Sequence, residues 1–394
     1  MEAALPSTAS PQRSRLAFLD AARGTAMLMM VLGHVNDGLL SPAAKTGSFF
    51  EHYWAVRGLT APLFLFVSGF AFVVASNPRW EEFRRPGPRL TKRLRRIGLL
   101  LVLGTFIQMP RWYGALFFDF THAEWQYVLR WGVLQCVATA IICGHLLLAL
   151  TRSKRGFAYA ALALALAIFA ATRMVTAAAL PDWLPLPVRM MLRTNEGSPF
   201  PLFPWLGHFL CGAGLARLTL DRPSLGRPLR LGTMLGLIGA ALLVASVALR
   251  AFQPERLLAP DYWVADPSLT MTRAGGAWCI FAGCAVLFGK LRWSPAWLMA
   301  IGARALSVYV LHLVALYGGP HLPGLVAFLG GKLPLVGGFA LGPALLAACL
   351  GTMLAVERGE VLFVRALERL GLRSPQTASG TRALEMAGEV EKQN

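Results

Sequence analysis

Charged residues are scarce in this sequence, and acidic ones are the scarcest. Lys, Arg, Asp and Glu make up 15% of the 394 residues, and 56% of the residues are hydrophobic. Soluble domains carry about 25% charged residues, so a soluble enzyme is disfavoured. Apolar stretches of about 20 residues, each long enough to cross the ~30 Å hydrocarbon core of a bilayer, account for the deficit. We therefore predict an all-α, multi-pass membrane protein.

The sequence also lacks cysteine motifs and phosphate-binding loops. None of its cysteines has the spacing of metal ligands, and none lies where a disulfide of an exported loop would form. We interpret them as small buried hydrophobes and expect no metal site. The Gly212-Ala213-Gly214 segment lies in an apolar stretch and indicates helix packing. The six cysteines are Cys136, Cys143, Cys211, Cys279, Cys284 and Cys349.

No leader and no internal repeat can be recognised. The first residues are polar and contain Pro and Ser, without an apolar core behind a basic start, so we expect no cleaved signal peptide. No period of 20 to 50 residues is present. We predict a disordered tail over 1–14, a single transmembrane domain over 15–370 and a disordered cytoplasmic tail over 371–394.

Ten apolar stretches are expected to be membrane-spanning helices. Of the Lys and Arg residues, 26 fall in the segments that would be cytoplasmic with the N-terminus inside, and 11 fall in the outer segments. The positive-inside rule therefore predicts that both termini are cytoplasmic. It also explains the net charge of +18 without nucleic acid, which we do not expect as a partner. The stretches are 22–40, 57–76, 97–116, 131–151, 156–176, 201–217, 231–250, 273–289, 295–318 and 339–356.

The first stretch carries ionisable side chains on one face. Arg23 and His34 are eleven residues apart, close to three helical turns, which places His34 about 16 Å deeper in the membrane. Asp20 and Asp37 continue the same stripe. Ionisable residues inside a span are costly and tend to be functional. The alternative is an arginine at a helix end and a histidine that bonds to a neighbouring helix.

Two further candidates follow the first stretch. His52 lies beside Glu51 in the loop before the second stretch, and Arg57 lies where that stretch begins. A histidine in a loop is more often solvated or interfacial than catalytic.

The beginning of the chain resembles the transmembrane acyltransferase superfamily. The motifs are the LDAARG entry, the Arg-x10-His interval that ends at His34, and a following FLFVSGF. The interval is that of the acyltransferase-3 proteins.

Later segments resemble the heparan-α-glucosaminide N-acetyltransferase catalytic-domain family, and most of all its bacterial membrane members. They read RLTKRLRRIGLLLVLG, LRWGVLQCVA, FPLFPWLGHFLCGAGLA and IGARALSVYVLHLV. Each motif is weak alone, but they occur in order. The resemblance extends from about Arg15 to Phe363.

The resemblance implies ten helices around a catalytic tunnel. Acyl-CoA, here acetyl-CoA, would enter from the cytoplasm, and a sugar or glycan acceptor would be acylated at the outer face. In this family a loop histidine is catalytic and a polar residue of the first helix assists it. These roles fall on His52 and His34, although the human-type branch has Asn at the second position and a shorter interval between the two.

Acyl transfer needs a base that removes the proton of the acceptor, and an imidazole suits that role. Two histidines could act as base and orienting partner or as nucleophile and base, so direct transfer and an acyl-histidine intermediate both remain open. Asp37 or Glu51 could hold one imidazole in the productive tautomer.

The remaining candidates divide between donor and acceptor. Arg89, Arg93 and Arg96, with Arg23, would bind the phosphates of CoA, although positive-inside anchoring explains most of this cluster. Candidate acceptor-binding residues are the polar and aromatic groups Asp20, Arg57, Gln135, Trp205, His208, Arg304, Ser307 and His312.

Two other functions remain. A transporter or flippase would move its substrate without acyl-CoA, and a membrane scaffold would not need His34 and Arg304 within spans. We expect a cell-membrane protein in contact with lipids. The sequence leaves a homodimer open.

Overall fold

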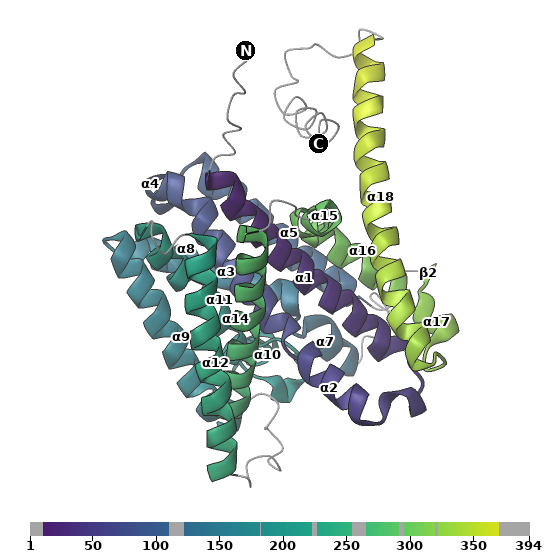
Figure 1. Ribbon diagram of the computed structural model, residues 1–394, viewed down its shortest axis with the longest axis horizontal. Coiled ribbons are helices and arrows are strands. Elements are labelled where there is room, and N and C mark those ends of the chain that lie inside the picture. Colours follow the sequence, from purple (N-terminus) through teal and green to yellow (C-terminus); the bar gives the residue numbers. More distant parts are fainter. Residues whose placement is uncertain are drawn as a thin grey trace, which may run out of the picture.

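The computed structural model describes residues 11–109, 122–181, 183–222, 227–253, 265–290, 295–319 and 322–369. These residues form a bundle of helices with a single two-residue hairpin, which confirms the all-α prediction (Figure 1). The hairpin consists of β1 (Gly318–Gly319) and β2 (Leu322–Pro323).

The first half of the chain forms the following elements. They are α1 (Pro11–Leu39), η1 (Ala43–Lys45), α2 (Ser48–Arg57), α3 (Thr60–Ser76), η2 (Asn77–Arg79), α4 (Trp80–Arg84), α5 (Pro88–Ile107), α7 (His122–Leu129), α8 (Val133–Leu150) and α9 (Lys154–Ala177).

The second half adds the remaining elements. They are α10 (Leu186–Leu192), η3 (Thr194–Glu196), α11 (Leu202–Asp221), α12 (Pro228–Phe252), α14 (Pro267–Lys290), α15 (Ala296–Ala303), α16 (Ala305–Tyr317), α17 (Leu325–Leu329) and α18 (Leu335–Arg369). Helix α18 extends beyond the bundle at one end (Figure 1).

Several helices have the length and apolar composition needed to cross a membrane. Six segments meet this description in the described part of the chain, and a seventh does if the bent pair α15–α16 is one span. The chain is thus a multi-pass membrane protein. The six are Ser48–Arg84, Val133–Leu150, Lys154–Ala177, Pro228–Phe252, Pro267–Gly289 and Leu335–Phe363.

All ten predicted stretches coincide with helices over their described parts, but ten spans remain a prediction. Three of the stretches fall on α1, α5 and α11, which are not among the six segments. Helix α5 opens with Arg89, Lys92 and Arg93, so its first turns are basic rather than apolar. Residues 110–116 of the third stretch lie outside the described residues.

The ninth stretch was expected to be continuous, and this expectation is wrong. Helices α15 and α16 meet at a bend of 85°. Arg304 lies at the bend with a non-helical backbone. Its guanidinium forms a bidentate ion pair with Glu357 of α18, with both N–O distances 2.6 Å. The pair holds the start of α16 against α18.

Small residues allow α3 and α11 to pack backbone against backbone. A Cβ on Gly69 would overlap the carbonyl oxygen of Phe209, and a Cβ on Gly212 would overlap that of Phe66. Close helix approach through small residues is typical of membrane bundles. The predicted packing role of the Gly212-Ala213-Gly214 segment is confirmed, and Gly69 is its counterpart on α3.

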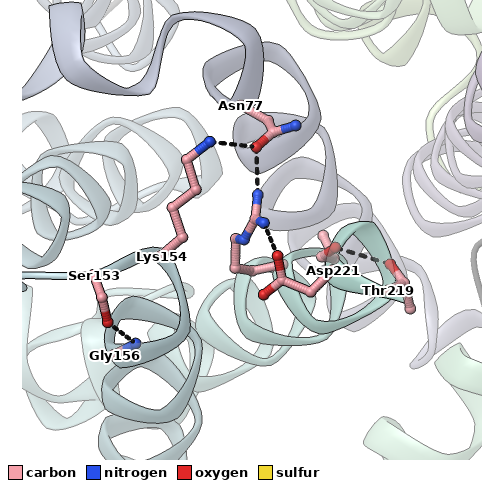
Figure 2. Close-up of polar contacts among 8 residues, drawn as sticks. Asn77, Ser153, Lys154, Gly156, Thr219 and Asp221 are labelled. Carbon is pink, nitrogen blue, oxygen red and sulfur yellow. Dashed lines mark hydrogen bonds and ion pairs between the residues drawn. The ribbon is translucent and has the colours of Figure 1, made fainter. Parts of the chain in front are cut away.

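A polar cluster joins three helices at the far end of α11. The buried Arg217 donates hydrogen bonds to Asn77 of η2 and to Asp221, and it forms an ion pair with the latter (Figure 2). Lys154, at the start of α9, lies 3.4 Å from the same Asn77 oxygen. Both cations also lie near the ring of Trp80. A buried charge needs such partners, so we interpret this cluster as structural.

Candidate active site

A cavity of about 220 Å³ opens where the N-terminal ends of α3, α8 and α11 meet the C-terminal half of α1. It is walled by apolar and aromatic side chains with a few ionisable ones. The lining residues are Met29, Met30, Gly33, His34, Arg57, Gly58, Thr60, Ala61, Val133, Pro199, Phe200, Trp205, Arg273 and Tyr309.

The chemical centre of this wall is a pair of histidines. His34 of α1 and His312 of α16 stack with ring centroids 5.2 Å apart, and Nδ1 of His34 lies 2.9 Å from Nε2 of His312. His312 is fully buried, whereas His34 lines the cavity. The structure thus shows the bond to a neighbouring helix that the sequence left open as the alternative, and it places His34 at the wall of a cavity as well.

The backbone of α16 fixes the tautomers of this pair. Nδ1 of His312 lies 2.9 Å from the carbonyl oxygen of Val308, which can only accept a hydrogen bond. In a neutral His312 the proton is therefore on Nδ1, and Nε2 is an acceptor. Nδ1–H of His34 must then donate to it. This leaves Nε2 of His34 unprotonated and able to take a proton.

Asp37 does not contact an imidazole among the described contacts, so its expected orienting role is not supported. Its carboxylate forms an ion pair with Arg57. Arg57 packs against Gly33, where a Cβ would lie 3.1 Å from Nε, and its guanidinium carbon lies 4.4 Å from the centroid of the Trp54 ring. Arg57 therefore lines the cavity in a fixed position beside His34.

His52 lies outside this cavity. It is an exposed residue of α2, and its Nδ1 lies 2.6 Å from the carbonyl oxygen of Ser48. A second, open pocket of about 530 Å³ is lined by Asp37, Lys45, Phe50, Glu51 and Trp54. The structure therefore does not bring His34 and His52 together as expected, because the partner of His34 is His312.

Trp205, a predicted acceptor-binding residue, lies in the cavity wall. Its ring stacks edge-to-face with Phe200, and the guanidinium carbon of Arg273 lies 5.2 Å from its centroid. His208 lies behind it and does not line the cavity, with its ring 5.1 Å from that of Phe169. Neither ring nitrogen of His208 has a hydrogen-bond partner among the described residues.

Three predicted acceptor ligands lie elsewhere. Gln135 is buried against α5, where a Cβ on Gly104 would lie 2.6 Å from its Oε1. Arg304 pairs with Glu357, as described above. Ser307 is half-buried on α16 but does not line the cavity.

Arg273 and Tyr309 line the wall but are not among the predicted site residues. Arg273 begins the eighth predicted stretch and was counted only as one of the basic residues of the outer side. Tyr309 had a usable signal, because it lies three residues before His312 and therefore on the same helix face.

The predicted donor-binding arginines separate into two groups. Arg93 donates to Ser76 Oγ at 2.8 Å and lies 3.3 Å from His145 Nε2, and Arg89 pairs with Glu82 at 2.8 Å. These two have structural partners. Arg96 is exposed and lies close enough to Arg23 to repel its charge.

Asp20 lies next to this basic region rather than at the cavity. Its carboxylate pairs with Arg23 on the same helix at 2.7 Å. Among the residues that the structure describes, no cluster of His, Cys, Asp and Glu could hold a metal ion.

Comparison with known proteins gives one result. The model of the family described as heparan-alpha-glucosaminide N-acetyltransferase, catalytic, matches residues 15–258. This span includes His34, His52 and Trp205, whereas Arg273, Tyr309 and His312 follow it. A search among curated proteins found no match.

Proposed function

Since the chain belongs to the heparan-alpha-glucosaminide N-acetyltransferase catalytic family, a family of membrane transferases that use acetyl-CoA, we propose that it acetylates a sugar or glycan acceptor at the outer face with acetyl-CoA from the cytoplasm. The observation that carries the proposal is the His34–His312 pair. It presents an unprotonated nitrogen at the wall of a cavity large enough for part of an acceptor.

In the proposed reaction, Nε2 of His34 accepts the proton of the acceptor hydroxyl or amine. The acceptor oxygen or nitrogen forms a bond to the acetyl carbon, and the carbon–sulfur bond of the thioester breaks. The electron pair leaves on the CoA sulfur, and the resulting thiolate takes up a proton from the cytoplasmic solution. His312 accepts the Nδ1–H hydrogen bond and so stabilises the imidazolium that forms.

Charge develops on the thioester oxygen during this attack. The guanidinium of Arg57 is the nearest fixed cation beside His34 in the wall, and Thr60 and Val133 begin helices that point their N-termini at the cavity. Fixed positive groups in a site that excludes water stabilise such charge without reorganisation. We assign that role to Arg57, which Asp37 holds in place.

We place the CoA phosphates at the other end of α1, near Arg23 and the exposed Arg96. This end lies about 16 Å from His34 along the helix. The extended donor would then run along α1 and bring its thioester to the cavity. Arg89 and Arg93 stabilise this end of the bundle through their contacts with Glu82, Ser76 and His145.

We propose that His52 transfers the proton from His34 to the outer solution. His52 is exposed, and its neighbour Glu51 lines the open pocket together with Asp37. Asp37 in turn pairs with Arg57 in the wall of the inner cavity. The Asp37–Arg57 ion pair thus joins a lining residue of the open pocket to one of the inner cavity, and we propose that protons leave by way of α2.

The test is acetylation by purified protein with acetyl-CoA and glucosamine, measured as thiol release that depends on the acceptor. His34→Ala should lower turnover at least about 100-fold, the usual contribution of a positioned base. Turnover of the parent protein should rise with pH, because a protonated His34 cannot accept a proton. His145→Ala, which removes a histidine at the opposite end of the bundle, is the control and should change turnover by less than the His34 variant.

Full turnover in the His34→Ala variant would contradict the proposal. Movement of glucosamine across the membrane without any release of CoA would show a transporter instead.

A further inference from the structure

The inner cavity has a second polar feature, on the wall formed by α11 and α14. Trp205 is 6% exposed, and its indole N–H has no hydrogen-bond partner among the described residues. A buried donor of this kind costs free energy unless something accepts its hydrogen bond. Because Trp205 lines the cavity, a bound molecule can meet that need.

The charged side chains in the described lining of the cavity have one sign. Two arginines, Arg57 and Arg273, are among its described lining residues, and no Asp or Glu is. Asp37 pairs with Arg57 and is not among the lining residues. The guanidinium carbon of Arg273 lies 5.2 Å from the centroid of the Trp205 ring, so the guanidinium and the indole are neighbours in the wall.

The helix ends add to this positive potential. The first residues of α3 and α8, Thr60 and Val133, and the first turn of α11 with Trp205 all border the cavity. Helix N-termini carry partial positive charge that favours an anion within the first turn. Guanidinium, indole N–H and helix N-termini are all donors, so the complementary group is an acceptor with negative charge.

We propose that Arg273 and Trp205 form an acceptor subsite for a carboxylate, so that the preferred acceptor is a sugar that carries one. The flat rings of Phe200, Trp205 and Tyr309 suit the face of a sugar ring. The carboxylate at Arg273 would then orient the nucleophile of the sugar toward His34. This inference rests on the proposed function, which it extends to the chemical class of the acceptor.

The test compares two acceptors that differ by one carboxylate, glucosamine and muramic acid, which is glucosamine with a lactyl group. In the parent protein, kcat/KM for muramic acid should exceed that for glucosamine at least about tenfold. Arg273→Gln should bring this ratio close to one, Arg273→Lys should keep part of it, and Trp205→Phe, which removes only the N–H and some ring area, should lower it.

The matched control is Arg250→Gln. Arg250 lies at the same end of the bundle on α12, where it hydrogen-bonds to Ser268 and Thr272 outside the cavity lining. This variant loses the same charge and should keep the preference. A similar loss in both variants would overturn the subsite, because it would show a general field rather than a contact.

A binding measurement separates the subsite from the reaction. Calorimetric titration of the His34→Ala variant should give at least about tenfold tighter binding of muramic acid than of glucosamine. The difference should disappear in His34→Ala/Arg273→Gln. Preferential binding without any acetylation would refute the proposed reaction and keep the subsite. Equal binding of the two sugars, or an effect of Arg273→Gln on the KM of acetyl-CoA alone, would refute the subsite.

Discussion

At the scale of single residues, the direction of the proposed proton transfer depends on a backbone carbonyl. Val308 accepts the hydrogen bond from His312, so His312 in turn accepts the one from His34. The Val308 carbonyl thus determines, through His312, which nitrogen of His34 is free to accept a proton. This arrangement uses a second imidazole where hydrolytic triads use a carboxylate, because Asp37 is already paired with Arg57.

His312 should consequently act through His34. We expect His312→Ala to lower kcat about 10- to 100-fold with little change in KM, and His312→Gln, whose amide oxygen can accept the same hydrogen bond, to recover part of the loss. Residues that act as a unit are non-additive, so His34→Ala/His312→Ala should be no worse than His34→Ala. Additive losses in steady-state kinetics would contradict the pairing.

His52 makes a different prediction because it is exposed. If it carries protons to the outer solution, His52→Ala should slow turnover in dilute buffer, and added imidazole should restore it. The buried position of the His34–His312 pair should prevent the same rescue of His34→Ala. Absence of rescue in the His52 variant would refute a relay.

At the scale of elements, the cavity exists because helices meet at fixed distances. Thr60 on α3 and Trp205 on α11 line the same space, and Gly69 and Gly212 set how closely these helices approach. On α16, the bend at Arg304 redirects the helix so that His312 faces α1. The ion pair of Arg304 with Glu357 keeps that direction.

Gly69→Ala should destabilise the protein because its Cβ would overlap the Phe209 carbonyl oxygen, which is backbone and cannot rotate away. We expect a loss of at least about 2 kcal/mol, within the range for overpacking, and a lower thermal midpoint in detergent. Gly283→Ala is the matched control, since its Cβ would meet nothing within 4 Å and alanine favours a helix. Equal midpoints in the two variants would contradict the close contact.

At the scale of the whole molecule, the distribution of charge sets the orientation in the membrane. Arg152 lies in the turn between α8 and α9, and Lys154 and Arg155 are the first residues of α9, whereas Ala178, Ala179 and Leu180, directly after α9, are neutral. By the positive-inside rule we predict that the first end of α9 is cytoplasmic and the second is external. The candidate active-site cavity, at the end of the bundle opposite the Arg217 cluster, would then face outward.

Introduced cysteines test this orientation. Arg152 and Ala179 are both exposed and flank α9. A membrane-impermeant maleimide should label Ala179→Cys in intact cells and Arg152→Cys only after permeabilisation. The native cysteines, all buried or half-buried in the structure, serve as the background control. Labelling of both sites from the same side would refute the predicted topology.

The sequence predicted the parts of this molecule that follow from local composition. Helical segments, packing glycines and the stripe that ends at His34 could all be predicted, because each depends on residues close together in the chain. The bend at Arg304, the pairing of Asp37 with Arg57 and the place of Arg273 in the cavity could not. They depend on which helices become neighbours, and the Trp205–Arg273 contact joins residues from α11 and α14 with no shared motif.

The two halves of the proton-accepting pair come from very different places in the chain, 278 residues apart. The segment that the family model matches, residues 15–258, contains the proposed base, His34, but ends before its partner, His312. A gene trimmed to that segment would therefore encode His34 without the hydrogen-bond partner that sets its tautomer, and a cavity without Arg273. If the proposed roles hold, the end of the match to the family model is not the end of the catalytic unit, and a minimal version must extend at least to His312.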